Sequence, residues 1–258
     1  NMTKTEAVEP TYWAAGNNAY YTCSRCGKVY KDEAGKTETM VEAEMLEKLP
    51  SIATGECGEK LHWVLTEDGT LVISGSGEMS SYSETEVAPW FRYRMKINSL
   101  IVEKGITRVG YYAFYGCIKL TSVSLPEGVT VIGDSAFRNC TGLTEVRIPE
   151  GVIYLDPGAF YGCSGLISVD IPDSVKYFGS SITPVYPAVY QGGVFENCTS
   201  LKSITIPAGA YVARDTFINC SGLTDVIIKE GIKEIEERTF SGCSSLTRIN
   251  IPESVTSI

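Results

Sequence analysis

The chain repeats one pattern, which is clearest in LTSVSLPEGVTVIGDSAFRNCTGL (residues 120–143) and in LTEVRIPEGVIYLDPGAFYGCSGL (residues 143–166). The fixed part of the pattern is Phe-x-x-Cys-x-x-Leu, and successive cysteines are 23, 23, 35, 22 and 23 residues apart. The copies are Phe114/Cys117/Leu120, Phe137/Cys140/Leu143, Phe160/Cys163/Leu166, Phe195/Cys198/Leu201, Phe217/Cys220/Leu223 and Phe240/Cys243/Leu246. A fixed period of this length indicates an array of stacked coils.

Each copy predicts the same succession of short elements. Apolar and polar residues alternate after each leucine, which is typical of a half-buried strand, and a proline ends most of these strands because it has no backbone donor. A second apolar pair, such as Val129 and Ile132, predicts a short second strand. The segment GDSAFRNC (residues 133–140) predicts a tight helical turn. The seven expected main strands start at Ile97, Leu120, Leu143, Leu166, Leu201, Leu223 and Leu246.

A single coil of this kind is not stable alone. It buries about seven apolar side chains at roughly 2 kcal/mol each, against an ordering cost of roughly 1.5 kcal/mol for every residue. Neighbouring coils must therefore cover its two faces, and the ends of the array need caps.

The pattern LxxVxIPxxVxxIGxxAFxxC resembles the BspA-like (treponemal-type) leucine-rich repeat of bacterial surface proteins, over residues 97–258. The resemblance implies a β-dominated solenoid with short helical turns and a parallel sheet. We expect a right-handed solenoid, because parallel crossover connections strongly prefer that hand.

The residues before the repeats predict a cap, at residues 51–96. CGEKLHWVLTEDGTLVISGSG (residues 57–77) predicts a β-hairpin with strands at residues 61–65 and 71–74 joined by the Asp68-Gly69 turn. APWFRYR (residues 88–94) predicts a short amphipathic element, and Trp63 and Trp90 are expected to shield the first coil. Similar surface proteins place such a cap ahead of their first repeat.

Residues 1–50 are expected to form a small separate segment. YYTCSRCGKVYKDEAG (residues 20–35) resembles a Cys-x-x-Cys-Gly element found beside such repeats in gut bacterial surface proteins. Cys23 and Cys26 have the spacing of a zinc knuckle, but a structural zinc site needs four ligands, and only Cys57 and His62 are candidates to complete it. A local disulfide, free thiols on a hairpin and a redox-active pair are the alternatives.

The six repeat cysteines are expected to be buried, reduced thiols that pack as small hydrophobic side chains. Stacked coils bring equivalent Cα atoms about 4.8 Å apart, which a disulfide permits. However, equivalent side chains point in parallel into the core, so the torsion about the sulfur atoms would distort each coil. A metal-binding cysteine ladder is the functional alternative.

Composition and charge exclude several classes of function. Hydrophobic residues make up 43% and charged residues 21% of the chain, which is ordinary globular composition, and the net charge of −9 disfavours nucleic acid as a partner. No apolar run approaches the roughly 20 residues that span a bilayer. The only histidine is His62, so an enzyme is not expected, nor is a cofactor.

The repeat pattern is still running at Ile258, so we expect a fragment of a longer surface or secreted protein, with its targeting and anchoring segments removed. Its last coil would lack a cap and could associate with another molecule.

Two surfaces are candidates for ligand binding. The first is the concave face of the main sheet, where small polar residues dominate and Arg147 with Asp170, and Asp225 with Arg248, are placed to form cross-strand ion pairs. A solvated sheet face is the alternative interpretation. The outward columns of this face are Ser99, Ser122, Glu145, Ser168, Ser203, Asp225, Arg248 and Ile101, Ser124, Arg147, Asp170, Thr205, Ile227, Asn250.

The second surface surrounds a 12-residue insertion in the third coil, at SSITPVYPAVYQGG (residues 180–193). Two prolines stiffen this insertion, and Tyr186 and Tyr190 offer large contact area at low entropic cost. Beside it, three consecutive coils place Tyr154, Tyr177 and Tyr211 at one position of the second strand, either as part of a ligand site or as packing under the inserted loop. The outward column of that strand is Arg108, Val131, Tyr154, Tyr177, Tyr211, Glu234 and Ser257.

These patterns predict a non-catalytic adhesion module on a bacterial surface that binds a protein or a glycan of a host or a neighbouring cell. The ligand-binding candidates are the five tyrosines of the second surface. The alternative is a structural spacer that displays another domain from the cell surface.

Overall fold

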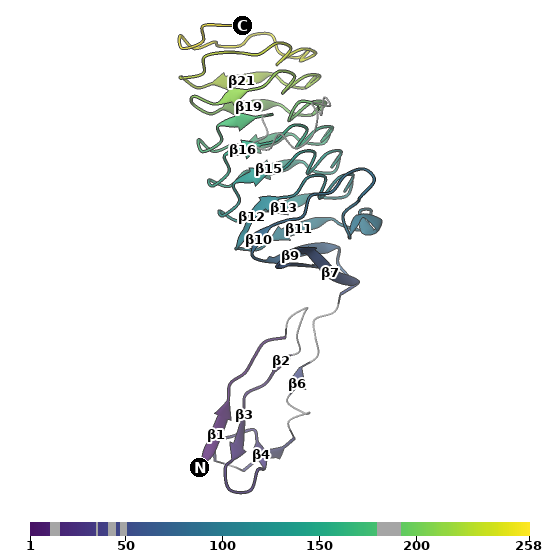
Figure 1. Ribbon diagram of the computed structural model, residues 1–258, viewed down its shortest axis with the longest axis vertical. Helices are drawn as coiled ribbons and strands as arrows, with labels where there is room; N and C mark the ends of the chain where they lie inside the picture. The colour runs from purple at the N-terminus through teal and green to yellow at the C-terminus, as the bar shows by residue number, and fades with distance from the viewer. Residues whose placement is uncertain (11–15, 35, 41–44, 47–50, 180–191) are drawn as a thin grey trace. The chain divides into compact units, whose positions relative to one another are not determined.

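The computed structural model describes residues 1–10, 16–34, 36–40, 45–46, 51–179 and 192–258. The chain folds into two compact units, Asn1–Ile52 and Ala53–Ile258 (Figure 1). The segment expected as a cap lies in the same unit as the repeats.

The N-terminal unit is a small antiparallel structure. Strands β1 (Met2–Thr5), β3 (Tyr20–Cys23), β4 (Val29–Tyr30) and β5 (Glu38–Thr39) pair in that order, and β2 (Gly16–Asn17) pairs with β6 (Met45–Leu46). The Cys-x-x-Cys segment thus lies on the β3–β4 hairpin, as one of the sequence interpretations had it. Apart from Gly16, none of the residues whose burial is described in this unit is buried.

The main sheet of the second unit begins with an antiparallel meander and continues as parallel repeats. The hairpin predicted from sequence is present as β8 (Leu61–Leu65) and β9 (Thr70–Gly75), and β7 (Ala53–Gly58) adds a strand that the sequence did not suggest. Strand β9 pairs in parallel with β11 (Ser99–Val102), which pairs with β13 (Ser122–Ser124).

The coils that follow keep the same register. Strand β15 (Glu145–Arg147) pairs with β17 (Ser168–Asp170), and β19 (Ser203–Ile206) pairs with β21 (Asp225–Ile228), all in parallel. The expected seventh strand, starting at Leu246, is reduced to one parallel bridge between Ile227 and Asn250.

A second sheet runs along the array, and all its strands are parallel. The strands are β10 (Gly77–Glu78), β12 (Ile106–Val109), β14 (Val131–Ile132), β16 (Tyr154–Leu155), β18 (Tyr177–Phe178) and β20 (Tyr211–Val212). Their register aligns Arg108, Val131, Tyr154, Tyr177 and Tyr211, which are five of the seven residues of the predicted column. The other two, Glu234 and Ser257, pair with each other through a bridge. The prediction that the column faces outward is wrong at Val131, which is buried.

The tight turns predicted from sequence are present, but they do not extend into helices. In the turn at residues 133–140, the N–H groups of Ala136, Arg138 and Cys140 donate to the carbonyls three residues earlier, each at 3.1 Å. Within the described ranges the only helix is the 3-10 helix η1 (Phe91–Tyr93), inside the predicted amphipathic element. The N–H groups between those of Ala136, Arg138 and Cys140 bond to the next coil: that of Phe137 donates to the carbonyl of Ala159 at 2.8 Å, and that of Asn139 to the carbonyl of Tyr161 at 2.7 Å. Inter-coil hydrogen bonds satisfy these groups, so the backbone does not need to form a helix.

The residue before each repeat cysteine explains why the turns close. It is always glycine or asparagine, and it has a left-handed φ between 59° and 76°, a conformation that these two residue types adopt most easily. These residues are Gly116, Asn139, Gly162, Asn197, Asn219 and Gly242. The sequence carried this signal in the recurring Gly-Cys and Asn-Cys pairs.

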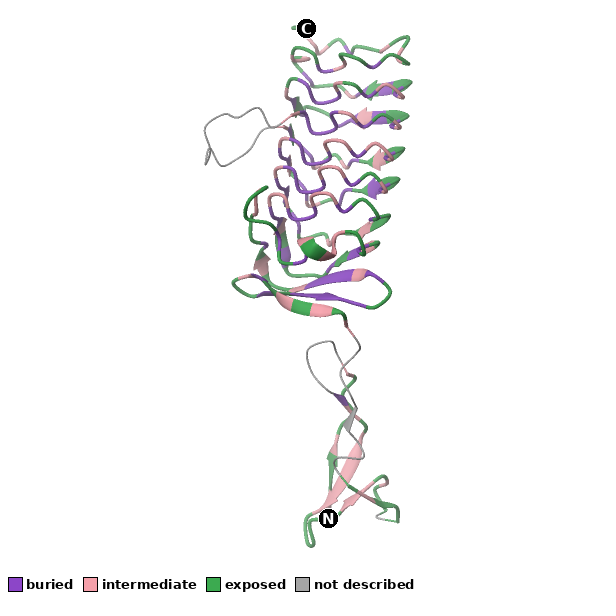
Figure 2. Ribbon diagram, turned by 90° about the vertical axis from the view of Figure 1, so that its right-hand side faces the viewer, coloured by how far each residue is buried: buried purple, intermediate pink, exposed green. Residues whose placement is uncertain are grey.

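The core is a spine of aromatic rings. Trp90, which is fully buried, stacks on Phe114 at a centroid distance of 5.6 Å, and its indole N–H donates to the carbonyl of Ala113 at 2.7 Å. Phenylalanines of later coils continue the stack at 5.2–5.5 Å: Phe137, Phe160, Phe195, Phe217 and Phe240. Figure 2 shows buried stretches in coil after coil.

Candidate binding surfaces

The outward face of the main sheet, the first candidate surface predicted from sequence, is polar and exposed. The Ser122 hydroxyl donates to the Ser99 hydroxyl at 2.9 Å, and Arg147 Nε lies 3.7 Å from Asp170 Oδ2. The Arg147 and Asp170 side chains remain 78% and 75% exposed, so their ion pair contributes at most about 1 kcal/mol. The second expected pair, Asp225 with Arg248, does not form between these two described residues.

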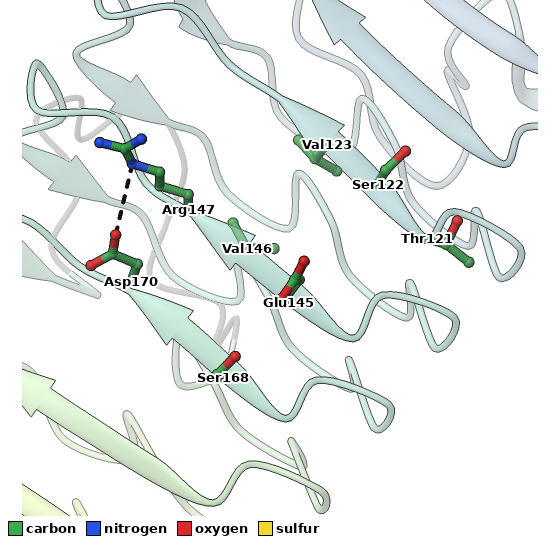
Figure 3. A pocket seen from close by; sticks show the side chains of 8 residues that line it. All are labelled: Thr121, Ser122, Val123, Glu145, Val146, Arg147, Ser168 and Asp170. Atoms are coloured by element: carbon green, nitrogen blue, oxygen red, sulfur yellow. Dashed lines mark ion pairs between the residues drawn. The ribbon is translucent and has the colours of Figure 1, made fainter.

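A shallow hollow of about 330 Å³ lies on this face (Figure 3). Its side chains come from three neighbouring strands, β13, β15 and β17, and from the residue before β13. The lining is Thr121, Ser122, Val123, Glu145, Val146, Arg147, Ser168 and Asp170. Hydroxyl groups and both signs of charge can bind a polar ligand here, but no histidine is present to act as a general base.

The tyrosine column on the second sheet is the more distinctive surface. The rings of Tyr154 and Tyr177 stack at a centroid distance of 4.7 Å and an interplanar angle of 7°. Tyr177 is 37% exposed and Tyr211 is 43% exposed, so part of each of these two side chains remains accessible to solvent. Tyr186 and Tyr190 lie outside the described residues.

Tyr211 interacts with the following coil. Its hydroxyl donates to Glu236 Oε1 at 3.3 Å. Partial burial raises the pKa of Tyr211, and the neighbouring Glu236 carboxylate raises it further. A hollow of about 280 Å³ lies beside this ring and is lined by Pro157, Gly179, Gly192, Gly193, Tyr211, Ala213, Arg214 and Glu236. Residues on both sides of the insertion therefore meet at Tyr211.

The turn edge of the coils carries aromatic and cationic contacts that sequence reasoning missed. Phe91 stacks on Tyr115 at 6.3 Å, and the Arg94 guanidinium lies 4.1 Å from the Phe91 ring centre. In a later coil, Arg138 lies 4.0 Å from the centre of the Tyr161 ring. The alignment of Tyr115, Arg138 and Tyr161 one period apart is the signal that could have revealed this edge.

Two carboxyl groups, those of the buried Asp156 and the partly buried Asp134, lie near the second sheet. Burial raises the pKa of Asp156 to about 7 and that of Asp134 to about 6. Arg108 partly offsets the effect at Asp156, because its Nη2 lies 3.8 Å from Asp156 Oδ2. These groups lie inside the coils, so we treat them as structural.

The structure shows no further ligands for the metal site that was considered at Cys23 and Cys26, among the residues that it describes. Across the described ranges, no group of three or more His, Cys, Asp or Glu residues could hold a metal ion. Cys57 is buried in the second unit, and its burial raises the pKa to about 12, which disfavours the thiolate that a metal needs.

The parallel sheets, the phenylalanine spine and the period of the coils define a leucine-rich-repeat solenoid. The family described as "BspA type Leucine rich repeat region" matches in 6 copies, over residues 88–183 and 191–258. The chain therefore belongs to the BspA-type leucine-rich-repeat family, as the sequence pattern suggested. Such proteins are generally non-catalytic, protein-binding modules of bacterial surfaces.

The fold agrees with that of one solved structure. The T. pallidum leucine-rich-repeat protein TpLRR is 21% identical and superposes with a TM-score of 0.54, over 74% of this chain and 91% of that chain. A leucine-rich-repeat protein from Bacteroides ovatus, also 21% identical, has a TM-score of 0.48 over 77% of this chain and 59% of that one. No curated protein matches the chain. In the described part of the chain, no helix has the length and apolar character needed to cross a membrane.

Proposed function

We propose that the chain is a non-catalytic binding module of a bacterial cell surface, and that its ligand surface is the tyrosine column with the adjoining insertion. The partner is a protein or a glycan of a host or neighbouring cell. The observation that carries the proposal is the exposure of Tyr177 and Tyr211, which lie on adjacent paired strands of the second sheet.

Physical chemistry supports this choice of surface. Tyrosine provides a flat, amphipathic face whose ordering on binding costs little entropy, and such faces suit sugar rings as well as apolar patches of proteins. The hollow beside Tyr211 adds the charged groups of Arg214 and Glu236, which can hydrogen-bond to the hydroxyl or amide groups of a ligand. We include Tyr154, Tyr186 and Tyr190 in the proposed site.

The spacer alternative predicts a different state for these tyrosines. A spacer needs only coils that stack, and tyrosines serving that purpose would be buried in contacts with other coils. The exposed fractions of Tyr177 and Tyr211 favour binding over a purely structural role.

The test is a binding screen followed by matched variants. The folded chain is applied to an array of glycans and extracellular proteins, and hits are measured again with Tyr177→Ala/Tyr211→Ala. We expect at least a tenfold loss of affinity, equivalent to about 1.4 kcal/mol. The lost ring stack and hydrogen bond should lower the free energy of unfolding by about 1–3 kcal/mol, so the affinity is measured at a temperature where the variant is folded. The matched control is Arg147→Ala/Asp170→Ala on the main sheet. If only the control variant loses binding, the proposal is wrong and the ligand binds to the main sheet.

A further inference from the structure

The nine cysteines, all in described positions, divide into two classes. Seven are buried in the second unit, whereas Cys23 is partly exposed and Cys26 is exposed in the N-terminal unit. The Cys-x-x-Cys motif, Cys23 to Cys26, has no part in the proposed ligand surface. Its two thiols are the cysteines that are not buried.

The local backbone brings these two thiols together. Cys23 is the last residue of β3, and its N–H donates to the carbonyl of Lys28 across the hairpin at 2.9 Å. The N–H of Gly27 donates back to the carbonyl of Cys23 at 2.9 Å, with Gly27 in the left-handed region at φ 73°. This tight turn folds Cys26 back onto Cys23.

The environment of Cys23 favours its thiolate. Hydrogen bonds from the backbone N–H groups of Cys26 and Arg25, and then from the Cys26 thiol, lower the pKa of Cys23. Burial acts in the opposite direction on the repeat cysteines and raises the pKa of Cys117 and Cys163 to about 12. Because the thiolate is the nucleophile, Cys23 should react far ahead of the buried thiols.

We propose that Cys23 and Cys26 form a reversible disulfide by exchange with a low-molecular-weight disulfide. A zinc site needs four ligands, and the described residues offer no cluster that could supply the other two. A disulfide needs only the sulfur atoms of Cys23 and Cys26, which belong to the tight turn that the hydrogen bond from the Gly27 N–H to the Cys23 carbonyl closes.

The exchange with glutathione disulfide proceeds in two balanced steps. Cys23 loses its proton, and its thiolate attacks one sulfur of glutathione disulfide; the S–S bond breaks, and one glutathione leaves and takes up a proton. Cys26 then loses its proton and attacks the Cys23 sulfur of the mixed disulfide, releasing the second glutathione. The protein pair is oxidised by two electrons, and glutathione disulfide is reduced to two thiols.

The disulfide would stabilise the N-terminal unit, Asn1–Ile52, which has few buried residues of its own. No residue with described burial in Asn1–Ile52 contributes a buried apolar side chain, and small extracellular units without a core commonly rely on disulfides. The proposal rests on this unit alone, so its failure would leave the proposed ligand surface untouched.

The test uses the full, folded and fully reduced chain. It is incubated with excess glutathione disulfide near neutral pH, blocked with iodoacetamide without denaturant, and analysed by intact-mass spectrometry and peptide mapping. We expect a loss of two alkylatable thiols, a mass lower by two hydrogen atoms and a peptide that links Cys23 to Cys26. The seven buried cysteines serve as the internal control, since they should be alkylated only in denaturant.

Two variants separate the roles of the thiols. Cys26→Ser should stop at a mixed disulfide with glutathione on Cys23, and Cys23→Ser should react severalfold more slowly. The proposal is overturned if both thiols of the unsubstituted chain remain alkylatable. It is also overturned if the chain retains one Zn²⁺ that blocks both thiols against glutathione disulfide.

Discussion

The Sγ atom of Cys140 donates a hydrogen bond to the backbone carbonyl oxygen of Phe114, 26 residues earlier and 3.2 Å away. The same contact recurs along the array at 3.1–3.3 Å, in the pairs Cys163–Phe137, Cys198–Phe160, Cys220–Phe195 and Cys243–Phe217. Each of these cysteines therefore ties its coil to the coil before it. This explains why the position carries a thiol and not simply a small apolar side chain.

Removing one such thiol should destabilise the solenoid. Cys163→Ala loses the hydrogen bond to Phe137 and leaves a small cavity, so we expect the free energy of unfolding to fall by about 1–2 kcal/mol. Urea unfolding measures this change. The control is Cys26→Ala on the exposed hairpin, which should change the stability of the solenoid by less than about 0.5 kcal/mol. Equal effects at the two positions would mean that the thiol contact contributes nothing.

The same thiols should make the fold sensitive to alkali. Burial raises the pKa of Cys117 and Cys163 from 9.0 to about 12, so above pH 9 the unfolded chain ionises thiols that the folded chain keeps neutral. Unfolding then releases protons, and the free energy of unfolding should fall by about 1.4 kcal/mol per pH unit for each thiol, up to about pH 12. Urea titrations at increasing pH test this. Cys117→Ala/Cys163→Ala should show a shallower slope, and an unchanged slope would contradict the assignment.

The sequence predicted the fold because the repeat couples each position to a structural role. The Phe-x-x-Cys-x-x-Leu spacing fixed the stacking and the register of the tyrosine column, both of which depend on period alone. It did not predict β7, because Ala53–Gly58 contains two glycines and alternates only weakly. It predicted the tight turns but not the hydrogen bonds that join them to the next coil, because such bonds leave no mark in the pattern of residues.

The candidate site was less predictable from sequence. Alignment of the repeats showed which residues share a column, but not how the rings lie. Tyr154 and Tyr177 stack, whereas Tyr211 hydrogen-bonds to Glu236 of the following coil, and that choice depends on side-chain torsions and neighbouring charge. The thiol hydrogen bonds were missed for the same reason, because spacing identifies a buried cysteine but not its acceptor.

Asp156 should make the protein more stable in mild acid than at neutral pH. Burial raises its folded-state pKa from 3.8 to about 7, so between these values the folded chain binds a proton that the unfolded chain does not. The stabilisation is fully present below pH 3.8 and is lost as the pH rises toward 7. Asp156→Asn should therefore raise the stability at neutral pH by about 1–3 kcal/mol and flatten the pH dependence.

The control for this prediction is Asp170→Asn, which removes an exposed carboxylate from a surface ion pair. It should change the free energy of unfolding by less than about 1 kcal/mol and leave the pH profile intact. Thermal unfolding across this pH range measures both variants. A loss of stability in Asp156→Asn would mean that the pairing of Asp156 with Arg108 outweighs the cost of burying its charge.

The left-handed turn position before each cysteine should tolerate asparagine better than alanine. Gly116 has φ 68° with no atom closer than 3.8 Å to an added Cβ, so Gly116→Ala meets only the backbone penalty of about 1 kcal/mol. Gly162 has φ 69°, but an added Cβ would lie 2.2 Å from the Asn139 side-chain oxygen, so Gly162→Ala should cost more, about 2 kcal/mol. Gly116→Asn should cost less than Gly116→Ala, since Asn139 adopts φ 60° in the equivalent turn. Urea midpoints rank the three variants, and alanine equalling or exceeding asparagine at Gly116 would refute the conformational argument.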